Sequence, residues 1–379
     1  MEKGKILVLT DWYEPGFKAG GPIRSCVNFA SYMKENYEIF ILTSDRDLGD
    51  EQAYPGISTG KWLNKDGTHI FYGRDADLSF ANLRNLVSGV SPNFIYLNSL
   101  FSKRFTIFPL MMNWKGDLKP KIILAPRGML RSSALAFKKT KKQIFLLLFK
   151  ILGIQKKVRW QATDEQEVRD IKQRFSNAEV VEAGNFPAAR QNEPPAFLQK
   201  EKGRINIVFV GRIHPIKNLH FLLQVLKHIR GRVKLEIVGS IEDEAYWKTC
   251  QHEIGLLPEN IEVNFRGEMS HDRLLTVLQR SHIFALPTTG ENFGHAIYEA
   301  LAAGRPVVIS DQTPWRHLSV AKAGWDIPLS KADEFIHAIE EAAGWDQQIF
   351  DQWSNSAWNF AGKSVDSNGL MNTYKKLFS

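Results

Sequence analysis

Residues 287–311 read PTTGENFGHAIYEALAAGRPVVISD, in which a loop, a helix, a turn and a strand follow one another. The first four of these residues form turns readily. From His295 to Ala303 apolar side chains recur at helical spacing, which predicts a helix, and Gly304 after them is typical of a helix C-cap. Pro306 then opens a short apolar strand rich in β-branched residues. This order is typical of a βαβ crossover in a parallel sheet.

Two glutamates lie around the start of this predicted helix, eight residues apart. Glu291 is in the preceding loop and Glu299 is about two turns into the helix, so both can face one ligand near the helix N-terminus. Between them lie Asn292, Phe293 and Gly294, whose free backbone N–H groups would form an anion site. Carboxylates accept hydrogen bonds from sugar hydroxyls, and Gly294 lets a phosphate approach the backbone. The pattern favours a pyrophosphate flanked by hydroxyl-rich groups, although an ordinary crossover helix with surface carboxylates is the alternative.

The stretch resembles the E-x7-E signature of the retaining GT-B glycosyltransferases, glycosyltransferase family 4 or "group 1". The Pro-Thr-Thr-Gly before it, the Phe-Gly pair within it and the Ala-Gly-Arg-Pro-Val-Val after it all contribute to the resemblance. In that family the first Glu holds the donor sugar and the second holds the ribose of the nucleotide, roles that fall here to Glu291 and Glu299. The resemblance implies an α/β, GT-B fold with two Rossmann-like doubly wound domains facing a cleft, and transfer with retention of anomeric configuration.

The composition agrees with a folded chain of two domains. The chain has 379 residues, of which 44% are hydrophobic and 24% are charged. Its two cysteines, Cys26 and Cys250, argue against a disulfide scaffold or a zinc site and fit a reducing compartment. The N-terminal residues lack the apolar region of a signal peptide, and no apolar run approaches 18 residues. We therefore expect a cytoplasmic protein, with peripheral attachment to the inner face of the plasma membrane left open.

Short apolar runs alternate with helical or mixed segments along the chain, which predicts parallel, doubly wound sheets. The strands expected are residues 5–10, 37–43, 94–98, 121–125, 158–163, 178–184, 205–211, 234–239, 261–267, 282–286 and 307–309, and HIFYG at residues 69–73 is strand-like. A proline-rich segment at residues 187–203 is the best linker candidate. We expect an acceptor-binding domain at residues 1–187 and a donor-binding domain at residues 203–350. By resemblance, a C-terminal helix at about residues 355–379 would pack back on the first domain. Residues 45–67 are polar and turn-rich, and we expect an insertion or mobile loop there.

Three places in the first domain are candidate binding positions. Gly20 and Gly21 follow the first strand and precede a helix, so they form a potential ligand loop. In the resembling family this place carries a Gly-rich loop near the donor phosphates and the acceptor. Asn98 and Arg127 follow two further strands, where ligands bind in such sheets. The family often has a His after one of these strands, where this chain has Asn98 and Arg127. The sequence therefore leaves open which residue of this domain assists catalysis. One interpretation of Arg127 is a side chain that binds a phosphate or carboxylate of the substrate. The other is a surface arginine in a loop.

The second domain carries two cations after its first strand. Arg212 and Lys217 lie five residues apart in the loop that follows residues 205–211, and two fixed cations there suit a pyrophosphate leaving group. The family has this Gly-Arg…Lys pair for that purpose. It also places a glycine near the nucleotide base, which falls here to Gly239. His295, directly after the anion loop, is either part of the site or a helix-surface residue.

Net charge is +8, and residues 138–159, KKTKKQIFLLLFKILGIQKKVR, contain eight basic residues and no acidic one. The basic residues flank an apolar run from Ile144 to Phe149. One interpretation is a helix with a core-facing stripe and a solvated basic rim. The other is a surface that meets anionic lipid head groups or a phosphorylated lipid acceptor. We find no helix-turn-helix, zinc-finger or RNA-recognition signature and expect no nucleic acid partner.

Glycosyltransferases of the other main fold bind a metal through Asp-x-Asp. Two literal copies occur, Asp45-Arg46-Asp47 and Asp75-Ala76-Asp77, but neither comes with the rest of that fold. We expect no cofactor and no metal, because Arg212, Lys217 and the helix starting near Gly294 would neutralise the departing diphosphate.

These features predict a metal-independent glycosyltransferase, in the EC 2.4 class. A UDP- or GDP-sugar would donate to a hydroxyl of a glycan or polyprenyl-linked acceptor. Arg127-Gly128-Met129-Leu130 resembles a motif of bacterial enzymes of surface polysaccharide and lipopolysaccharide assembly. Two alternatives are a GT-B nucleotide-sugar 2-epimerase, which the E-x7-E stretch disfavours, and a non-catalytic lipid- or glycan-binding scaffold, which the intact set of two glutamates and two cations disfavours.

Overall fold

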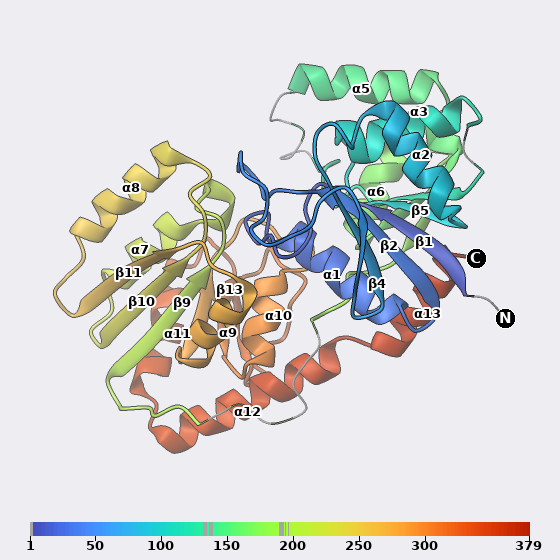
Figure 1. Ribbon diagram of the computed structural model, residues 1–379. Helices are drawn as coiled ribbons and strands as arrows, with labels where there is room; N and C mark the ends of the chain where they lie inside the picture. Colours follow the sequence, from blue (N-terminus) through green and yellow to red (C-terminus); the bar gives the residue numbers. More distant parts are fainter. Residues whose placement is uncertain are drawn as a thin grey trace. The chain divides into compact units, whose positions relative to one another are not determined.

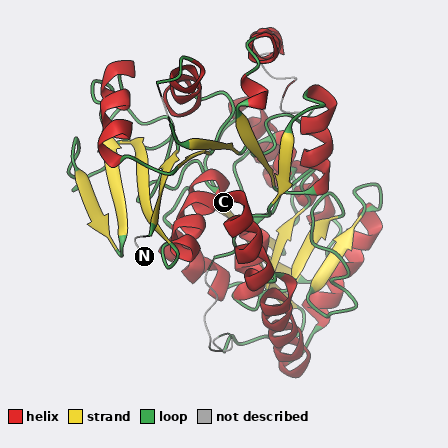
Figure 2. Ribbon diagram, turned by 90° about the vertical axis from the view of Figure 1, so that its right-hand side faces the viewer, coloured by secondary structure: helices red, strands yellow, loops and turns green. Residues whose placement is uncertain are grey.

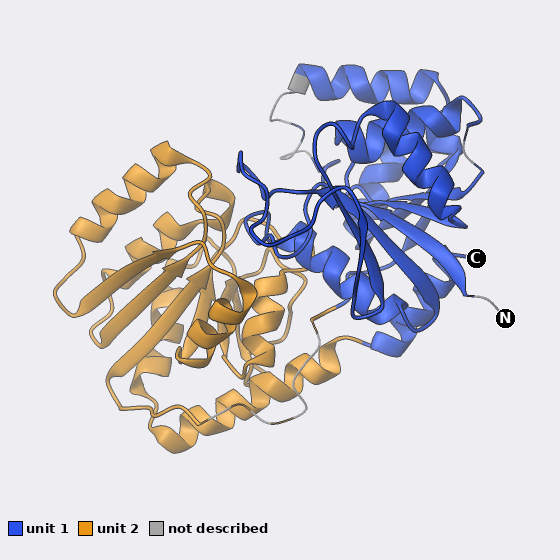
Figure 3. Cartoon of the chain, in the orientation of Figure 1, with its two compact units in different colours: residues 1–186, 366–379 blue, residues 187–365 orange. Residues whose placement is uncertain are grey.

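The computed structural model describes residues 3–117, 119–131, 135, 139–188, 193, 195 and 197–379. The chain forms two compact units, residues 1–186 with 366–379 (unit 1) and residues 187–365 (unit 2), shown in Figure 3. Each unit has one sheet that is mainly or wholly parallel, with helices between the strands (Figure 1). The α/β class predicted from the sequence is therefore confirmed.

The boundaries differ from the predicted ones in the C-terminal segment. The chain was expected to return to the first domain from about residue 355, but it returns from Asp366. Helix α12 (Gln347–Ser364) stays with unit 2, because Trp353, Ala357 and Ala361 are buried in the unit 2 core. Helix α13 (Ser367–Leu377) is the part that packs in unit 1.

The sheet of unit 1 has the strand order β3-β4-β2-β1-β5-β6-β7-β8. All neighbours pair in parallel except β3, which runs antiparallel to β4 at the edge of the sheet. The strands are β1 (Gly4–Leu9), β2 (Tyr37–Ser44), β3 (Trp62–Lys65), β4 (Thr68–Gly73), β5 (Phe94–Leu97), β6 (Lys121–Leu124), β7 (Val158–Ala162) and β8 (Glu179–Glu182).

Helices cover both faces of this sheet, as the ribbon coloured by secondary structure shows (Figure 2). Alternate residues of β1 face opposite layers: Leu7 and Leu9 join one core cluster, and Ile6 and Val8 join the other. The first layer holds α2 (Phe80–Val90), α3 (Phe108–Trp114), α5 (Lys139–Ile151) and α6 (Glu165–Arg174). The second holds α1 (Gly21–Met33) and α13. Short helical turns occur at Lys103–Ile107 and Ile154–Lys156.

The prediction of an irregular insertion at residues 45–67 is wrong in part. Strand β3 lies within it and pairs with β4 through Trp62, opposite Phe71, and Lys65, opposite Thr68. The sequence WLNK is too short and polar to stand out as a strand, which is usual for an edge strand open to solvent on one side. Asp45 and Asp47 at the start of the segment are buried.

The sheet of unit 2 has the order β11-β10-β9-β12-β13-β14, and every pair of neighbours is parallel. The strands are β9 (Arg204–Val210), β10 (Arg232–Val238), β11 (Ile261–Gly267), β12 (Ile283–Leu286), β13 (Val307–Ser310) and β14 (Gly324–Ile327). The helices are α7 (Leu219–Leu226), α8 (Glu244–Gly255), α9 (His271–Gln279), α10 (His295–Ala302), α11 (Ala332–Gly344) and α12, with a short 3-10 turn at Pro215–Lys217.

The loop-helix-turn-strand order predicted for residues 287–311 is confirmed by α10 and β13. Gly304 has a φ of 70°, and a Cβ at this position would lie 2.1 Å from Cγ of Pro195. Both the backbone conformation and the close packing therefore require glycine. Arg305 next to it is buried, and its guanidinium donates to the carbonyls of Ala303 and Ser281, which fastens the turn to the segment between α9 and β12.

Each strand order reverses at one place near the middle of the sheet. In unit 2 the reversal lies between β9 and β12, and in unit 1 it lies between β1 and β5. Open parallel sheets bind ligands in the crevice outside the carboxyl ends of the strands at such a point. The loops that follow these four strands are therefore where a binding site is expected.

Candidate active site

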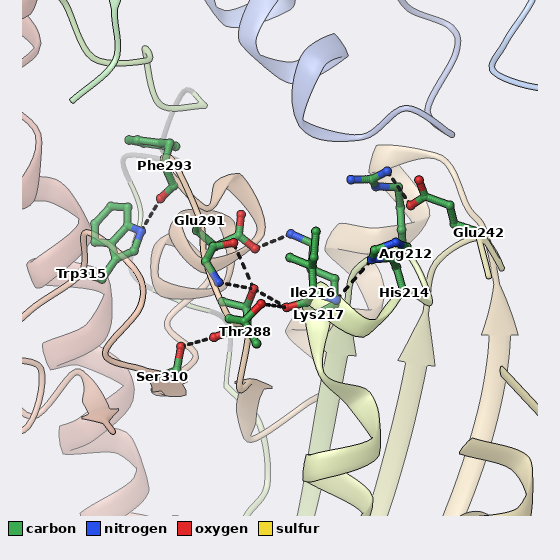
Figure 4. A network of polar contacts seen from close by, with 12 residues as sticks. Arg212, His214, Ile216, Lys217, Glu242, Thr288, Glu291, Phe293, Ser310 and Trp315 are labelled. Atoms are coloured by element: carbon green, nitrogen blue, oxygen red, sulfur yellow. Dashed lines mark hydrogen bonds and ion pairs between the residues drawn. The ribbon is translucent and has the colours of Figure 1, made fainter. Parts of the chain in front are cut away.

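The loop after β9 carries the two predicted cations of unit 2, Arg212 and Lys217. His214 accepts a hydrogen bond from the N–H of Ile216 at its Nδ1 (3.2 Å) and so begins the 3-10 turn that ends at Lys217. The turn directs Lys217 toward the loop that follows β12 (Figure 4). Local capping at His214 thus fixes where the ammonium group lies.

Lys217 and Glu291 form an ion pair across the reversal point of the sheet. Their side chains are only 17% and 13% exposed. Figure 4 shows the two side chains pointing toward each other from the loops after β9 and β12. The structure thus brings together the cation expected to face a pyrophosphate and the carboxylate expected to face a sugar.

Hydrogen bonds hold the loop of Glu291 to its neighbours. Thr288 donates from Oγ1 to the carbonyl of Ile216 (2.9 Å), and the N–H of Thr289 donates to the same carbonyl (2.8 Å). The hydroxyl of Ser310, at the end of β13, donates to the carbonyl of Thr288. Loops after β9, β12 and β13 are therefore fastened together, which keeps Glu291 in place before any ligand arrives.

Arg212 lies on the other side of the same loop and has its own carboxylate partner. Its Nη1 is 2.5 Å from Oε2 of Glu242, which follows β10. Both predicted cations of unit 2 are therefore paired with carboxylates. Gly239 directly follows β10 and has a φ of 151°, and a Cβ there would lie 2.0 Å from the carbonyl oxygen of Gly211. This close approach keeps the loops after β9 and β10 in contact. Packing therefore requires glycine at position 239, apart from the predicted place of Gly239 near the nucleotide base.

The N-terminus of α10 has the form of an anion site. Gly294 is the N-cap residue with a φ of 76°, and no side chain caps the helix there. A Cβ on Gly294 would lie 2.9 Å from Cδ1 of Ile297. The carbonyl of Phe293 accepts a hydrogen bond from Nε1 of Trp315 (2.6 Å), which fixes the preceding peptide (Figure 4). Asn292, which follows Glu291 in the sequence, is half-buried.

Glu299 and His295 are both buried on α10. Glu299 Oε1 lies 3.7 Å from Nδ1 of His271, the first residue of α9. The ring of His295 lies 4.8 Å from that of Phe293, centroid to centroid. His295 is therefore not the helix-surface residue that the sequence left open as an alternative.

The glycine loop of unit 1 is held by a residue from the first Asp-x-Asp triplet. Gly20 has a φ of 61° and precedes α1, which begins at Gly21. Oδ2 of Asp47 accepts from the N–H groups of Phe17 (2.7 Å) and Lys18 (3.1 Å), and so anchors the loop after β1. This carboxylate has a structural role, which explains its burial.

The second triplet is also engaged in ion pairs. Asp75 pairs with Arg104 at 2.6 Å, and Asp77 pairs with Arg74 at 2.9 Å. Within the part of the chain that the structure describes, no three His, Cys, Asp or Glu residues are grouped to hold a metal ion.

Arg127 and Asn98 are brought together in unit 1. Nη2 of Arg127 donates to Oδ1 of Asn98 (2.7 Å) and to the hydroxyl of Tyr96 (2.7 Å), and Nη1 donates to Asn185. Gln161 accepts from the Tyr96 hydroxyl and donates to that of Tyr374 on α13 (2.8 Å). Both terminal nitrogens of Arg127 therefore already serve a network that joins β5, β7 and α13.

Sequence reasoning missed Asp11 and Ser102. Ser102 donates from Oγ to Oδ1 of Asp11 at 2.7 Å, between the loops that follow β1 and β5 at the reversal point of unit 1. Burial raises the pKa of the Asp11 carboxyl, and the Ser102 hydroxyl and the charge of Arg104 partly offset this. The available signal was a carboxylate directly after an apolar strand. Glu242 and His271 were missed as well, because their partners are far away in sequence.

Residues 190–344 match the family described as "Glycosyl transferases group 1". The chain is 32% identical over 106 residues to an uncharacterized glycosyltransferase of Methanocaldococcus jannaschii, covering 27% of this chain and 26% of the relative. It is 25% identical over 171 residues to the D-inositol 3-phosphate glycosyltransferase of Mycobacteroides abscessus, covering 42% and 38%. It is 29% identical over 115 residues to the O-antigen chain mannosyltransferase of Salmonella typhimurium, covering 30% and 32%. The chain thus spans well under half the length of these relatives.

Solved structures resemble the chain over nearly its full length. Sucrose-phosphate synthase of Thermosynechococcus elongatus has a TM-score of 0.67 at 14% identity and covers 99% of both chains. Anabaena HepE in complex with UDP-glucose has a TM-score of 0.67 at 15% identity, covering 98% of this chain and 99% of that one. WaaG, a glycosyltransferase involved in lipopolysaccharide biosynthesis, has a TM-score of 0.65 at 13% identity and covers 98% of both. At these identities the likeness shows a common fold.

Proposed function

Residues 190–344 belong to the group 1 glycosyl transferases within a chain of GT-B fold, and from this premise we propose that the protein transfers a sugar from a nucleoside-diphosphate donor to an acceptor hydroxyl. The donor binds at the loops after β9, β10 and β12 and at the N-terminus of α10. The transfer retains the anomeric configuration of the sugar.

The observation that carries this proposal is the Lys217–Glu291 pair at the reversal point of the unit 2 sheet. A diphosphate needs cations and N–H donors, and the start of α10 adjoins this loop. When the diphosphate engages Lys217, the carboxylate of Glu291 becomes available to the sugar hydroxyls. One ion pair thus holds both groups in position, and contacts with the donor replace it when the donor binds.

Glu299 is the residue we assign to the ribose, and the loop at Gly239 to the base. Glu299 lies on α10, to whose first N–H groups we assign the phosphates. The structure of Anabaena HepE was solved in complex with UDP-glucose, which supports a uridine nucleotide as the first donor to test.

In the proposed reaction the bond between the anomeric carbon and the phosphate oxygen breaks, and a bond to the acceptor oxygen forms on the same face. The acceptor proton passes to an oxygen of the departing phosphate. Arg212, Lys217 and the N-terminus of α10 stabilise the charge that develops on the diphosphate, which is the electrostatic form of catalysis. With this charge balanced by protein groups, the reaction proceeds without a metal ion.

We assign acceptor binding to unit 1 and propose a glycan or a polyprenyl-linked acceptor of bacterial surface-polysaccharide assembly. Relatives named for D-inositol 3-phosphate and O-antigen chains support a hydroxyl on a phosphorylated or polysaccharide acceptor. Within unit 1, we assign the orientation of such a hydroxyl to Asp11, whose Oδ1 accepts a hydrogen bond from Ser102 at the reversal point.

Thermal unfolding of the full chain with nucleoside diphosphates and nucleotide sugars, in the presence of EDTA, tests the donor site. A ligand at about 100 times its dissociation constant stabilises by about 2.7 kcal/mol, which raises the Tm by several degrees. We expect this shift with one diphosphate, and we expect Lys217→Ala and Glu299→Gln to abolish it. Lys227→Ala is the matched control, because it removes another ion pair of unit 2, that with Glu253, away from the loops of the site.

Absence of a shift with every nucleotide would contradict the proposal, and so would a shift that requires divalent metal. With the donor identified, the products distinguish the remaining alternatives. A transferase consumes donor only with an acceptor, whereas a 2-epimerase releases free sugar without one. Proton NMR of the product shows whether the anomeric configuration is retained.

A further inference from the structure

Helix α5 presents apolar side chains on two opposite faces. Its inner residues Leu146 and Phe149 are buried in the core of unit 1. Four others are exposed to solvent by 55%, 59%, 52% and 69%: Ile144, Leu147, Leu148 and Ile151. We call these four residues the outer stripe. Because they are spaced i, i+3, i+4 and i+7, they lie along one face of the helix.

The outer stripe has cations around it and no acidic residue within its own segment. Lys141 and Lys150 are exposed on α5, and residues 138–159 contain no Asp or Glu. Leu147 and Lys150 also line a surface hollow that continues to Arg174 of α6. Apolar side chains and cations therefore lie side by side, at the edge of a hollow lined by Lys150 and Arg174.

We propose that the outer stripe and its flanking cations bind the surface of an anionic lipid bilayer, with α5 lying in the plane of the interface. The leucine and isoleucine side chains would enter the boundary of the acyl chains, and Lys141, Lys150 and Arg174 would contact lipid phosphates. This is the arrangement of interfacial amphipathic helices, in which buried apolar area and attraction to anionic lipid add together. Among the described residues, none of the helices has the length and apolar character of a membrane span.

Charge distinguishes a bilayer from a second copy of the chain. In a two-fold dimer the same patch faces itself, so Lys141 and Lys150 would approach the equivalent cations of the other copy. The segment holds no carboxylate to compensate them. An anionic bilayer supplies both the apolar phase for the stripe and the counter-charge for the lysines.

Binding of the full chain to large unilamellar vesicles tests this inference, measured by flotation without donor or acceptor. The result is independent of the proposed transferase activity, because no substrate is present. Vesicles of phosphatidylcholine with phosphatidylglycerol are compared with phosphatidylcholine alone, in about 0.1 M and about 0.5 M salt. We expect binding to the anionic vesicles to be about tenfold tighter or more, and to weaken at the higher salt.

The variant Leu147→Gln/Ile151→Gln removes half of the outer stripe without touching the core, and we expect it to weaken binding by about tenfold or more. Lys141→Gln/Lys150→Gln should remove the preference for anionic lipid. The matched control is Leu256→Gln/Val320→Gln, which changes two exposed apolar residues of unit 2 and should bind like the unaltered chain.

Three outcomes would overturn the inference. The first is no binding to either vesicle, and the second is equal binding by the outer-stripe variant. The third is a dimer, in sedimentation velocity, that Leu147→Gln/Ile151→Gln dissociates, since the outer stripe would then be an interface between two copies. Circular dichroism of each variant establishes that α5 and the rest of the chain remain folded.

Discussion

Lys217 and Glu291 form an ion pair, but we assign them to different parts of the donor, so the two residues should respond differently to substitution. In Glu291→Gln the ammonium group of Lys217 no longer has a carboxylate competing with the diphosphate. We expect nucleoside diphosphate to bind a few-fold more tightly, since a partly exposed ion pair contributes up to about 1 kcal/mol. Turnover should fall by about 100-fold or more, because the sugar loses the carboxylate that orients it.

Calorimetric titration and steady-state kinetics together check this opposite response. Glu253→Gln removes the partner of Lys227 elsewhere in unit 2 and serves as the control, with both quantities unchanged. Weaker diphosphate binding in Glu291→Gln would mean that the pair acts as one structural unit, against the exchange proposed here.

His282 makes stability depend on pH in a defined window. Its Nδ1 accepts from the N–H of Asn206 (2.8 Å), so its Nε2 donates to the carbonyl of Gln199 (2.9 Å), which requires the neutral ring. Burial lowers the pKa of His282 from 6.5 to about 4. Between these pH values the unfolded chain binds a proton that the folded chain does not, so the unfolding free energy falls as pH decreases from 6.5 to 4.

The loss in unfolding free energy attributable to His282 is about 3 kcal/mol, from 1.36 kcal/mol per pKa unit. Urea unfolding at several pH values gives the slope of the unfolding free energy against pH. The difference in this slope between the unaltered chain and His282→Gln measures the contribution of His282. The exposed His337→Gln should keep the full slope. Equal slopes in all three proteins would show that His282 titrates normally.

At the scale of elements, two glycines at the ends of neighbouring strands separate backbone strain from close packing. Gly239 and Gly267 both have positive φ, but a Cβ on Gly239 would strike the carbonyl oxygen of Gly211, whereas that on Gly267 would meet nothing within 4 Å. We expect Gly267→Ala to cost about 1 kcal/mol from backbone conformation alone. Gly239→Ala should cost about 3 kcal/mol or more, because the loop of Arg212 must move.

Denaturant unfolding gives both values, and diphosphate binding gives a second readout that Gly267→Ala should leave unchanged. Similar costs for the two variants would mean that the loops after β9 and β10 separate easily.

The elements that the sequence predicted well are those whose signal is local. Strands β1, β2 and β9 each contain four consecutive apolar residues, and they begin and end within about one residue of the predicted bounds. Strands β3 and β14 were not predicted, because WLNK and GWDI contain too few apolar residues to stand out. Helix α5 shows another limit: the sequence shows that its middle is apolar, but only the fold shows which apolar residues face the core.

At the scale of the whole molecule, the candidate site was predictable where one loop carries the signal. Glu291, Glu299 and Gly294 lie in one stretch, and Lys217 was found by its distance from a strand end. The role of Arg127 was not predictable, because its network draws on Tyr96, Asn185 and, through Gln161, Tyr374. Partners that come from such distant segments meet only after the sheet has formed.

The two units should also lose stability separately, although the chain passes from unit 1 to unit 2 and back. Phe378 is buried in the core of unit 1, after helix α13, and Phe335 is buried in the core of unit 2. Replacing a buried Phe by Ala costs about 3–5 kcal/mol through lost burial and the cavity left behind. Each unit has its own core, so a cavity in one should leave the other intact.

Amide hydrogen exchange with mass spectrometry measures this strand by strand. In Phe378→Ala, peptides from β1 and β2 should exchange faster while those from β9 and β10 keep their protection. Phe335→Ala should give the reverse pattern, and each variant therefore serves as the control for the other. If either substitution speeds exchange equally in both sheets, the units unfold as one cooperative body. The return of α13 to unit 1 would then couple the stability of the two units.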